Sequence, residues 1–454
     1  MMRAIARYGI RSIPGDEKEI IAAFRRGEAV AGPAVTEFEQ AFAEYHGLDQ
    51  AITASFGRMA FYYLLRALDL PPQSEIILPA VTFWVIPEIA RCAGFIPVFV
   101  DVDAGTFNLD PAQIEAAVTE RTRAIVPTHL YGQPCEMSEV MRVAERHDLI
   151  VIEDCAQAAG ARYRGRPVGT FGHASFFSFQ MLKGINTYGG GMVLTNDSNL
   201  ALKVRAQVDA EPPQTTAELI KRFAAGVATR SLVSPKGFVW WGVPLGAGAS
   251  LLTNHDFSQY FWERIRPLDR FPASYRRRYA NVQAILGLRA LKQLDEFNQR
   301  SRAHADVYTR GLAAWPAIAT PQVISGAEHV FYQYCIYVSN PGRARRRAIR
   351  RGVDLETTHV DVCSSLSLFR EFAADCPAAE KSAAVLQLPV YSRLRPADVE
   401  RVRRTLLEVT FDLAALAGSA GAPPGTEEVS APATKVMRGF AAKVGGEPSA
   451  KRTG

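Results

Sequence analysis

The residues best suited to chemistry are a carboxylate and a lysine, each placed at or just after the end of an apolar run. Asp154 ends the run LIVIED at 149–154, and Ser178 and Lys183 lie at the end of and just beyond the run ASFFSF at 174–179. If both runs are parallel strands, these side chains lie at the sheet edge where open α/β folds bind ligands. The structural alternatives are a helix N-cap for Asp154 and a solvated position for Lys183.

Together, a lysine amine and a carboxylate are the groups that pyridoxal phosphate (PLP) chemistry requires. The amine forms a Schiff base with the cofactor, the carboxylate pairs with the pyridine nitrogen, and further donors hold the phosphate. Asp154 and Lys183 lie 29 residues apart, on the ends of what look like consecutive strands. The glycine run TYGGGM (187–192) is not a dinucleotide-binding loop, since it precedes the strand MVLT instead of following a strand and opening a helix.

A parallel sheet must position these residues, and the sequence pattern predicts one. From about Gly27 to Asp197, short apolar runs alternate with amphipathic segments, which is typical of βα units. We expect strands at 51–54, 75–79, 97–102, 124–129, 149–154, 174–179 and 191–195. We expect helices at 33–46, 58–68, 84–93, 110–119 and 137–147, with Asp110 as an N-cap before Pro111.

The whole chain divides into five predicted parts. They are an N-terminal segment at 1–26, a large PLP-binding domain at 27–208, an atypical aromatic and apolar insertion at 209–273, a long helix and small α/β domain at 274–417, and a disordered tail at 418–454. In the fourth part we expect one helix at 279–314, a strand at 333–339 and a basic helix at 343–351. The tail is rich in Gly, Ala and Pro and cannot bury enough apolar surface to become ordered.

Composition excludes several classes of protein. With 454 residues, 48% of them hydrophobic and 22% charged, the chain is of the ordinary globular type, and its net charge of +6 is too small to indicate a partner. The six cysteines lack CxxC spacing, so we expect no metal site and a reducing, cytoplasmic setting; the N-terminus does not read as a signal peptide. Six arginines between Arg343 and Arg351 have no aromatic residues among them, so we expect no nucleic-acid partner.

Six ordered motifs at family spacing, within residues 13 to 410 and outside the insertion, make the chain resemble the DegT/DnrJ/EryC1/StrS family of PLP-dependent sugar aminotransferases. They are GEAVAGPAVTEFEQAFAEYHG (27–47), ILPAVTFWVIPEIARCAGFIPVFVDVDAGTFNLD (77–110), RTRAIVPTHLYGQP (121–134), VIEDCAQAAGARYRGRPVGTFG (151–172), SFFSFQMLKG (175–184) and GGGMVLTND (189–197). The resemblance implies the aspartate aminotransferase fold, fold type I, with a mainly parallel seven-stranded sheet flanked by helices and a smaller C-terminal α/β domain.

The resemblance also assigns roles to single residues. Lys183 takes the position of the lysine that bonds PLP, and Asp154 that of the partner of the pyridine nitrogen. Phe83 falls where an aromatic ring stacks on the cofactor, Gln157 where a side chain faces its ring oxygen, and Ser178 where a hydroxyl binds its phosphate. In a dehydratase branch of the family the lysine position is histidine, so Lys183 favours amino transfer.

The reaction that the resemblance implies moves an amino group from an amino acid, glutamate or glutamine, to a keto group on a sugar or cyclitol that is often nucleotide-linked. It further implies a homodimer, because fold type I active sites lie at a subunit interface. Two alternatives stay open: a PLP-dependent dehydratase or lyase on a related sugar, and a non-catalytic regulatory protein that retains the fold. Lys183 with its carboxylate partner argues against the second.

The phosphate end of the predicted site departs from the family pattern. The family's Gly-Thr turn corresponds to Gly57 and Arg58, followed by Met59, so a guanidinium replaces a hydroxyl; arginine can hold phosphate through two hydrogen bonds. The acidic residue of the family's Gly-Glu-Gly-Gly turn corresponds to Gly189. The segment through which a neighbouring subunit reaches the phosphate corresponds to 274–276, which leaves open whether that subunit completes the site.

The insertion contains an uncharged run, GFVWWGVPLGAGASLLTN, at 237–254. It is too short for a membrane-spanning helix and is interrupted by Pro244 and four glycines. Its aromatic residues, with Arg222 and Arg230 nearby, suit either packing within the protein or contact with a membrane surface or a lipid-linked acceptor through 237–262. We therefore expect a cytoplasmic protein, with membrane association as the alternative.

Overall fold

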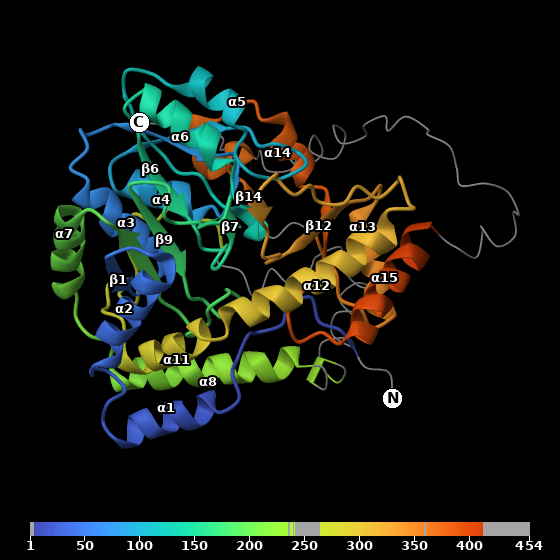
Figure 1. Ribbon diagram of the computed structural model, residues 1–454, viewed down its shortest axis with the longest axis horizontal. Coiled ribbons are helices and arrows are strands. Elements are labelled where there is room, and N and C mark those ends of the chain that lie inside the picture. The colour runs from blue at the N-terminus through green and yellow to red at the C-terminus, as the bar shows by residue number, and fades with distance from the viewer. Residues whose placement is uncertain (1–3, 235–236, 239, 241–263, 358–359, 412–454) are drawn as a thin grey trace, which may run out of the picture. The chain divides into compact units, whose positions relative to one another are not determined.

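A seven-stranded sheet forms the centre of the fold (Figure 1). The computed structural model describes residues 4–234, 237–238, 240, 264–357 and 360–411. The strand order across the sheet is β1 (Gln50–Ala54), β10 (Gly191–Thr195), β9 (Ala174–Ser178), β6 (Ile150–Asp154), β5 (Thr122–Ile125), β2 (Glu75–Pro79) and β4 (Ile96–Val100). Strand β10 is antiparallel to both of its neighbours, and the other pairings are parallel. The predicted fold class and each predicted strand are confirmed, although β5 ends at Ile125, before Pro127.

Helices cover both faces of this sheet, and for that reason its strands are continuous apolar runs. One face packs against α3 (Gly57–Ala67), α4 (Val85–Cys92) and α7 (Ser198–Asp209). The other packs against α2 (Ala34–His46), α5 (Pro111–Ile114), α6 (Met137–Arg146) and α11 (Asn281–Leu291). Successive residues of β9 show the alternation: the Phe176 ring lies 4.8 Å from Phe61 of α3, and the Phe177 ring lies 5.0 Å from Phe42 of α2.

Two helix predictions need correction. The helix expected at 110–119 is shorter: Asp110 caps α5 by accepting a hydrogen bond from the backbone N–H of Ala112 at 3.0 Å, but α5 passes into a 3₁₀ turn at Glu115–Ala117. The chain must turn there to enter β5. The single helix expected at 279–314 is two helices, α11 and α12 (Leu294–Leu312), because α11 packs on α2 while α12 packs on α15 (Pro396–Phe411), so the two follow different neighbours.

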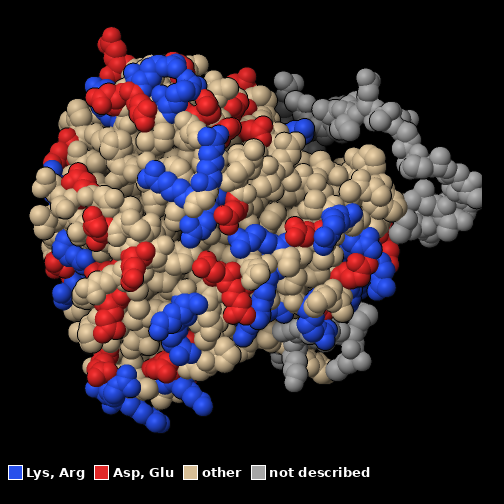
Figure 2. Space-filling view, in the orientation of Figure 1, with Lys and Arg blue, Asp and Glu red and all other residues tan. Residues whose placement is uncertain are grey.

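The remaining elements form small sheets and flanking helices. A three-stranded antiparallel sheet contains β12 (Tyr334–Tyr337), β15 (Val385–Leu388) and β13 (Glu356–Thr357), with α13 (Pro341–Arg350) and α14 (Pro377–Ser382) in the same part of the chain. The short strands β11 (Ala327–Glu328), β7 (Arg162–Tyr163) and β8 (Arg166–Pro167) form a second sheet, and β14 (Asp361–Val362) pairs with β3 (Val81–Thr82). On the face drawn in Figure 2, basic and acidic side chains are interspersed.

The predicted insertion opens with a regular helix, which the sequence pattern did not indicate. Helix α8 (Thr216–Val233) starts with a capping box between Thr215 and Glu218 and packs beside α1 (Asp16–Arg25) (Figure 1). The apolar run at 237–254 lies outside the described residues except for Gly237, Phe238 and Trp240, as does the tail at 418–454. Among the helices that the structure describes, none combines the length and the apolar character needed to cross a membrane.

Candidate active site

Asp154 is the last residue of β6 and is 3% exposed. Its Oδ1 accepts a hydrogen bond from the backbone N–H of Ala156 at 3.0 Å, whereas Oδ2 makes no hydrogen bond within the described part of the chain. Burial raises the pKa of this carboxyl, and the hydrogen bond from Ala156 and the nearby Lys183 partly oppose the rise. A buried carboxylate with one oxygen left over is suited to receive a cationic donor.

Lys183 lies in the loop between β9 and β10, within electrostatic reach of Asp154. Its backbone N–H donates to the carbonyl of Gln180 at 2.9 Å, and its Nζ lies 4.8 Å from the ring centroid of Tyr332. Burial lowers the pKa of the amine; Asp154 opposes this effect and Arg58 adds to it. A lysine whose pKa is lowered by desolvation is a better nucleophile near neutral pH.

The N-terminus of α3 forms a cradle against the end of β9. A Cβ added to Gly57 would lie 2.9 Å from both the carbonyl oxygen of Phe177 and the Cβ of Ser178, so only glycine fits this close approach. The N–H of Gly57 and the hydroxyl of Ser178 make no hydrogen bond within the described residues. N–H groups at a helix N-terminus that make no hydrogen bond within the chain, beside a hydroxyl, favour a bound phosphate. Met59 offers no such donor, because its side chain is buried in the core and its N–H donates to the carbonyl of Phe56 at 3.0 Å.

Two arginines add positive charge at this cradle. The guanidinium of Arg58 lies 4.9 Å from the ring centroid of Tyr275 and 5.6 Å from that of Phe83, and its Nη1 donates to the hydroxyl of Tyr275. The guanidinium of Arg222, on α8, lies 5.3 Å from the ring centroid of Phe56, which Arg58 also approaches.

Arg222 also explains the departure at Gly189. A Cβ on that glycine would lie 2.1 Å from Nη1 of Arg222, so the arginine fills the space beside the turn. No local pattern in the sequence indicates this contact or the contacts of Tyr275 and Tyr332. Two arginines that follow Tyr275 form ion pairs away from the cradle: Arg276 pairs with Glu211 at 2.9 Å, and Arg277 pairs with Glu218 at 3.0 Å.

Gln157 and Phe83 lie at the same edge of the sheet. The Oε1 of Gln157 accepts a hydrogen bond from the N–H of Tyr131 at 2.9 Å, so the amide nitrogen is the group left to meet a ligand oxygen. Phe83 is half-buried, with one flank near Arg58. The structure thus brings Lys183, Asp154 and Arg58 into one electrostatic neighbourhood, at a sheet edge that also carries Ser178, Gly57 and Gln157.

His129 belongs to a buried network that supports β6. Its Nδ1 accepts from the N–H of Cys135 at 2.9 Å, so its Nε2 must carry the proton that it donates to Glu153 at 3.0 Å. The Glu153 carboxylate also accepts the backbone N–H groups of Gly169, Phe171 and Gly172 at 2.6 to 2.8 Å.

Glu153, His129 and Cys155 lie close enough to one another to hold a metal ion. The nitrogens of His129 and both oxygens of Glu153 are already used in hydrogen bonds, so we interpret the group as structural.

These features fit PLP. The cradle at Gly57, the unused oxygen of Asp154 and the desolvated amine of Lys183 match the three groups of the cofactor, namely its phosphate, its ring nitrogen and its aldehyde.

A model of the DegT/DnrJ/EryC1/StrS aminotransferase family matches residues 14–407. The chain belongs to this family. The GDP-perosamine synthase of Caulobacter vibrioides is 32% identical over 386 residues, which cover 83% of this chain and 90% of that protein. The pleiotropic regulatory protein of Geobacillus stearothermophilus is 32% identical over 394 residues, covering 85% of this chain and 91% of that protein.

Solved structures agree with this assignment. The crystal structure of DesV from S. venezuelae matches with a TM-score of 0.70 at 26% identity, covering 89% of this chain and 99% of that one. Membership of the DegT/DnrJ/EryC1/StrS family, the fold type I architecture and aminotransferase activity, all predicted from the sequence, are confirmed. The family implies PLP as the cofactor, together with an amino donor and a sugar acceptor.

Proposed function

We propose that the protein transfers an amino group from glutamate or glutamine to a keto group on a sugar or cyclitol, in most cases one linked to a nucleotide. The observation that carries this proposal is the buried neighbourhood of Lys183 and Asp154 at the carboxyl edge of the sheet. The relative named GDP-perosamine synthase supports a nucleotide-linked acceptor.

In this proposal PLP supplies the electron sink for the substrate Cα–H bond when it is bound. Lys183 would hold the cofactor through its Nζ, and the same Nζ would move a proton to and from the substrate carbon. Asp154 would accept a hydrogen bond from the ring nitrogen through Oδ2 and would keep that nitrogen protonated. Gln157 would donate its amide N–H to the ring oxygen, and Phe83 would pack against the ring.

The phosphate is held, in the same proposal, by Ser178, the N–H of Gly57 and the guanidinium of Arg58. Arg58 supplies the charge that replaces the family's threonine hydroxyl, and Tyr275 orients it from the same chain. Met59 then contributes to the turn by packing, because its own N–H is already bonded.

The proposal is tested by incubating the purified protein with PLP, glutamate or glutamine, and a panel of nucleotide-linked keto-sugars, keto-cyclitols and lipid-linked keto-sugars. We expect mass spectrometry to detect one newly aminated product, which is absent with Lys183→Ala. A dehydrated product instead of an aminated one would support the dehydratase alternative. A protein that binds no PLP would contradict the proposal and favour a regulatory role.

A further inference from the structure

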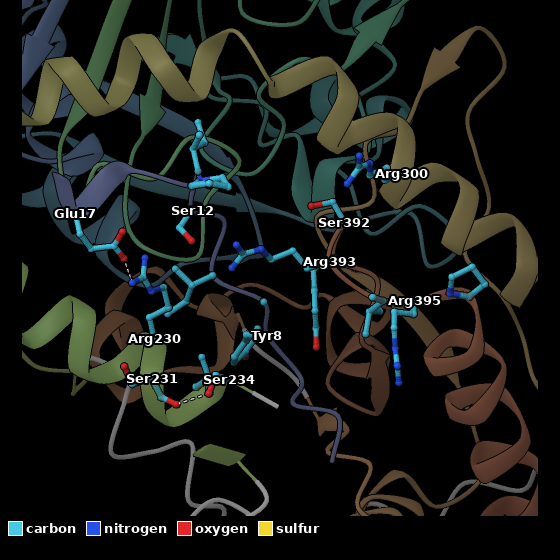
Figure 3. A pocket seen from close by; sticks show the side chains of 18 residues that line it. Tyr8, Ser12, Glu17, Arg230, Ser231, Ser234, Arg300, Ser392, Arg393 and Arg395 are labelled. Carbon is cyan, nitrogen blue, oxygen red and sulfur yellow. Dashed lines mark hydrogen bonds and ion pairs between the residues drawn. The ribbon is translucent and has the colours of Figure 1, made fainter. Parts of the chain in front are cut away.

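A second cavity, of about 860 Å³, lies apart from the cofactor cradle, between the N-terminal segment, the end of α8, helix α12 and the loop before α15 (Figure 3). Its described lining holds four arginines, at positions 230, 300, 393 and 395, but a single acidic residue, Glu17. A concave surface with this excess of one sign of charge attracts an anion.

Two of these arginines approach each other. Arg393 extends toward the side of the cavity that holds Arg230, as Figure 3 shows, and its charge, together with burial, lowers the pKa of Arg230. Arg230 pairs with Glu17, Arg300 with Glu296 and Arg395 with Asp398, whereas Arg393 makes no ion pair within the described part of the chain. The cavity therefore contains one guanidinium whose charge is not balanced by a carboxylate.

Two serine hydroxyls complete the polar lining. Ser12 is 8% exposed and Ser392 is 5% exposed, and both line the cavity (Figure 3). Neither hydroxyl makes a hydrogen bond within the described residues. Both hydroxyls line the cavity and are therefore available to donate to the oxygen of a bound ligand.

This cavity shares lining residues with a smaller cavity near Lys183. Tyr8, Gly9 and Tyr391 line both this cavity and a smaller one of about 30 Å³. The smaller cavity extends to Leu182, the neighbour of Lys183 in the chain, and to Tyr332, whose ring lies 4.8 Å from the Lys183 amine. The shared residues place the large cavity near the chain segment that carries the reacting lysine.

We propose that this cavity binds the phosphate groups of the amino acceptor, with Arg393 and Arg230 as charge partners and the hydroxyls of Ser12 and Ser392 as further donors. Phosphate oxygens accept the paired N–H groups of a guanidinium, which makes arginine well suited to them. The volume suits an organic phosphate far better than inorganic phosphate alone. This assignment rests on the proposed function, because it takes the acceptor to carry phosphate.

The test compares the wild-type holoenzyme with Arg393→Gln and with the double variant Ser12→Ala, Ser392→Ala. Calorimetry measures the binding of ADP, GDP, UDP, dTDP and inorganic pyrophosphate at low and high salt. We expect at least one nucleoside diphosphate to bind, Arg393→Gln to weaken it at least tenfold and reduce its salt dependence, and the serine variant to weaken it severalfold. Arg404→Gln is the control, since it removes an exposed arginine of α15, at 68% side-chain exposure, and should change the affinity less than twofold.

A kinetic measurement separates this proposal from the proposed function. Arg393→Gln should raise KM for the acceptor with little change in kcat, and should leave the half-reaction with glutamate unchanged. If no keto-sugar is aminated but nucleoside diphosphate binding still depends on Arg393, the function fails and the phosphate site stands. Unchanged binding in Arg393→Gln overturns the site. Binding that does not compete with the acceptor overturns the assignment to acceptor and indicates a free phosphorylated effector.

Discussion

Lys183 is placed so that burial, more than any partner, sets its reactivity. Burial lowers its pKa to about 8 from 10.5, although Asp154 opposes the shift. The neutral amine is the nucleophile, so the rate at which the apoprotein captures PLP should rise with pH and level off above about 8. Stopped-flow absorbance measures this rate, and Nα-acetyl-lysine amide serves as the reference for a solvent-exposed lysine amine. A midpoint above 10 would contradict the buried site, and borohydride reduction with peptide mapping should place the label on Lys183.

Asp154 should matter for the chemistry more than for holding the cofactor. Its Oδ2 is the oxygen left for the ring nitrogen, while Oδ1 is bonded to Ala156. In Asp154→Asn the protein should still bind PLP through Lys183, but the half-reaction with glutamate should slow by roughly 10² to 10³-fold, which is typical when one electrostatic stabiliser is removed. Rapid-scan absorbance checks this. A rate within threefold of the wild type would remove Asp154 from the proposed role.

The positions of Asp154 and Ser178 at strand ends could be predicted from the sequence, whereas the roles of the cofactor-site residues stay predictions that the family resemblance implies. The position of Asp154 follows from the run that precedes it, and that of Ser178 from β9. Arg222 and Tyr275 could not be found in this way. The contact between Arg58 and Tyr275 joins residues 217 positions apart, so it depends on how α8 and the chain after it return to the sheet.

Helix α3 begins with Gly57 because the cradle leaves no room for a side chain there. In Gly57→Ala the new Cβ would meet the Phe177 carbonyl at 2.9 Å, so the helix start must move away from Ser178. We expect about a tenfold weaker affinity for PLP and a lower Tm, because overpacking typically lowers the free energy of unfolding by roughly 1–3 kcal/mol. Fluorescence titration and calorimetry measure both. Gly342→Ala is the matched control in the first turn of α13, where the atoms nearest to an added Cβ are the far end of an arginine at 3.4 Å and Oδ1 of Asn340 at 4.0 Å; an equal effect there would contradict the cradle.

Helix α8 shows why the insertion was the least predictable part. Its buried residues, Leu219, Phe223 and Gly226, follow helical spacing, but they form a narrow stripe that includes a glycine, so the apolar pattern in the sequence is weak. The same helix turns Arg222 and Arg230 toward the protein, where they meet the carbonyl of Tyr188 and Glu17. Both arginines are therefore engaged within the chain.

Contact between the insertion and lipid stays a proposal, which now depends on apolar residues. Trp240 is 64% exposed and Leu232 is 46% exposed. Because Arg222 and Arg230 are engaged within the chain, binding to liposomes should survive 0.5 M salt. At that ionic strength the Debye length is roughly a few Å, so interactions between surface charges are largely screened. Trp240→Ser should abolish cosedimentation, whereas Leu202→Ser, a 67% exposed residue on α7, should not. Absence of binding by the wild type would show that the segment packs within the protein or its assembly.

The whole protein should be a homodimer, as the family resemblance implies. Light scattering at micromolar concentration should give twice the chain mass of 49.8 kDa. A stable, active monomer would contradict this. The division of the chain at residues 26, 208, 273 and 417 also stays a prediction; limited proteolysis of the purified protein would locate the exposed boundaries.

Within such a dimer, the structure predicts that Tyr275 acts on the phosphate site of its own chain, through Arg58. Tyr275→Phe should therefore weaken PLP binding severalfold. A hybrid of one Lys183→Ala chain and one Tyr275→Phe chain decides which subunit supplies the tyrosine. In this hybrid, only the Tyr275→Phe chain retains Lys183. The site around that lysine contains the phenylalanine if residue 275 acts within its own chain, and it contains the tyrosine of the other chain if residue 275 acts across the interface. We expect the affinity of the hybrid to match that of the Tyr275→Phe homodimer; wild-type affinity would show that the neighbouring subunit completes the site.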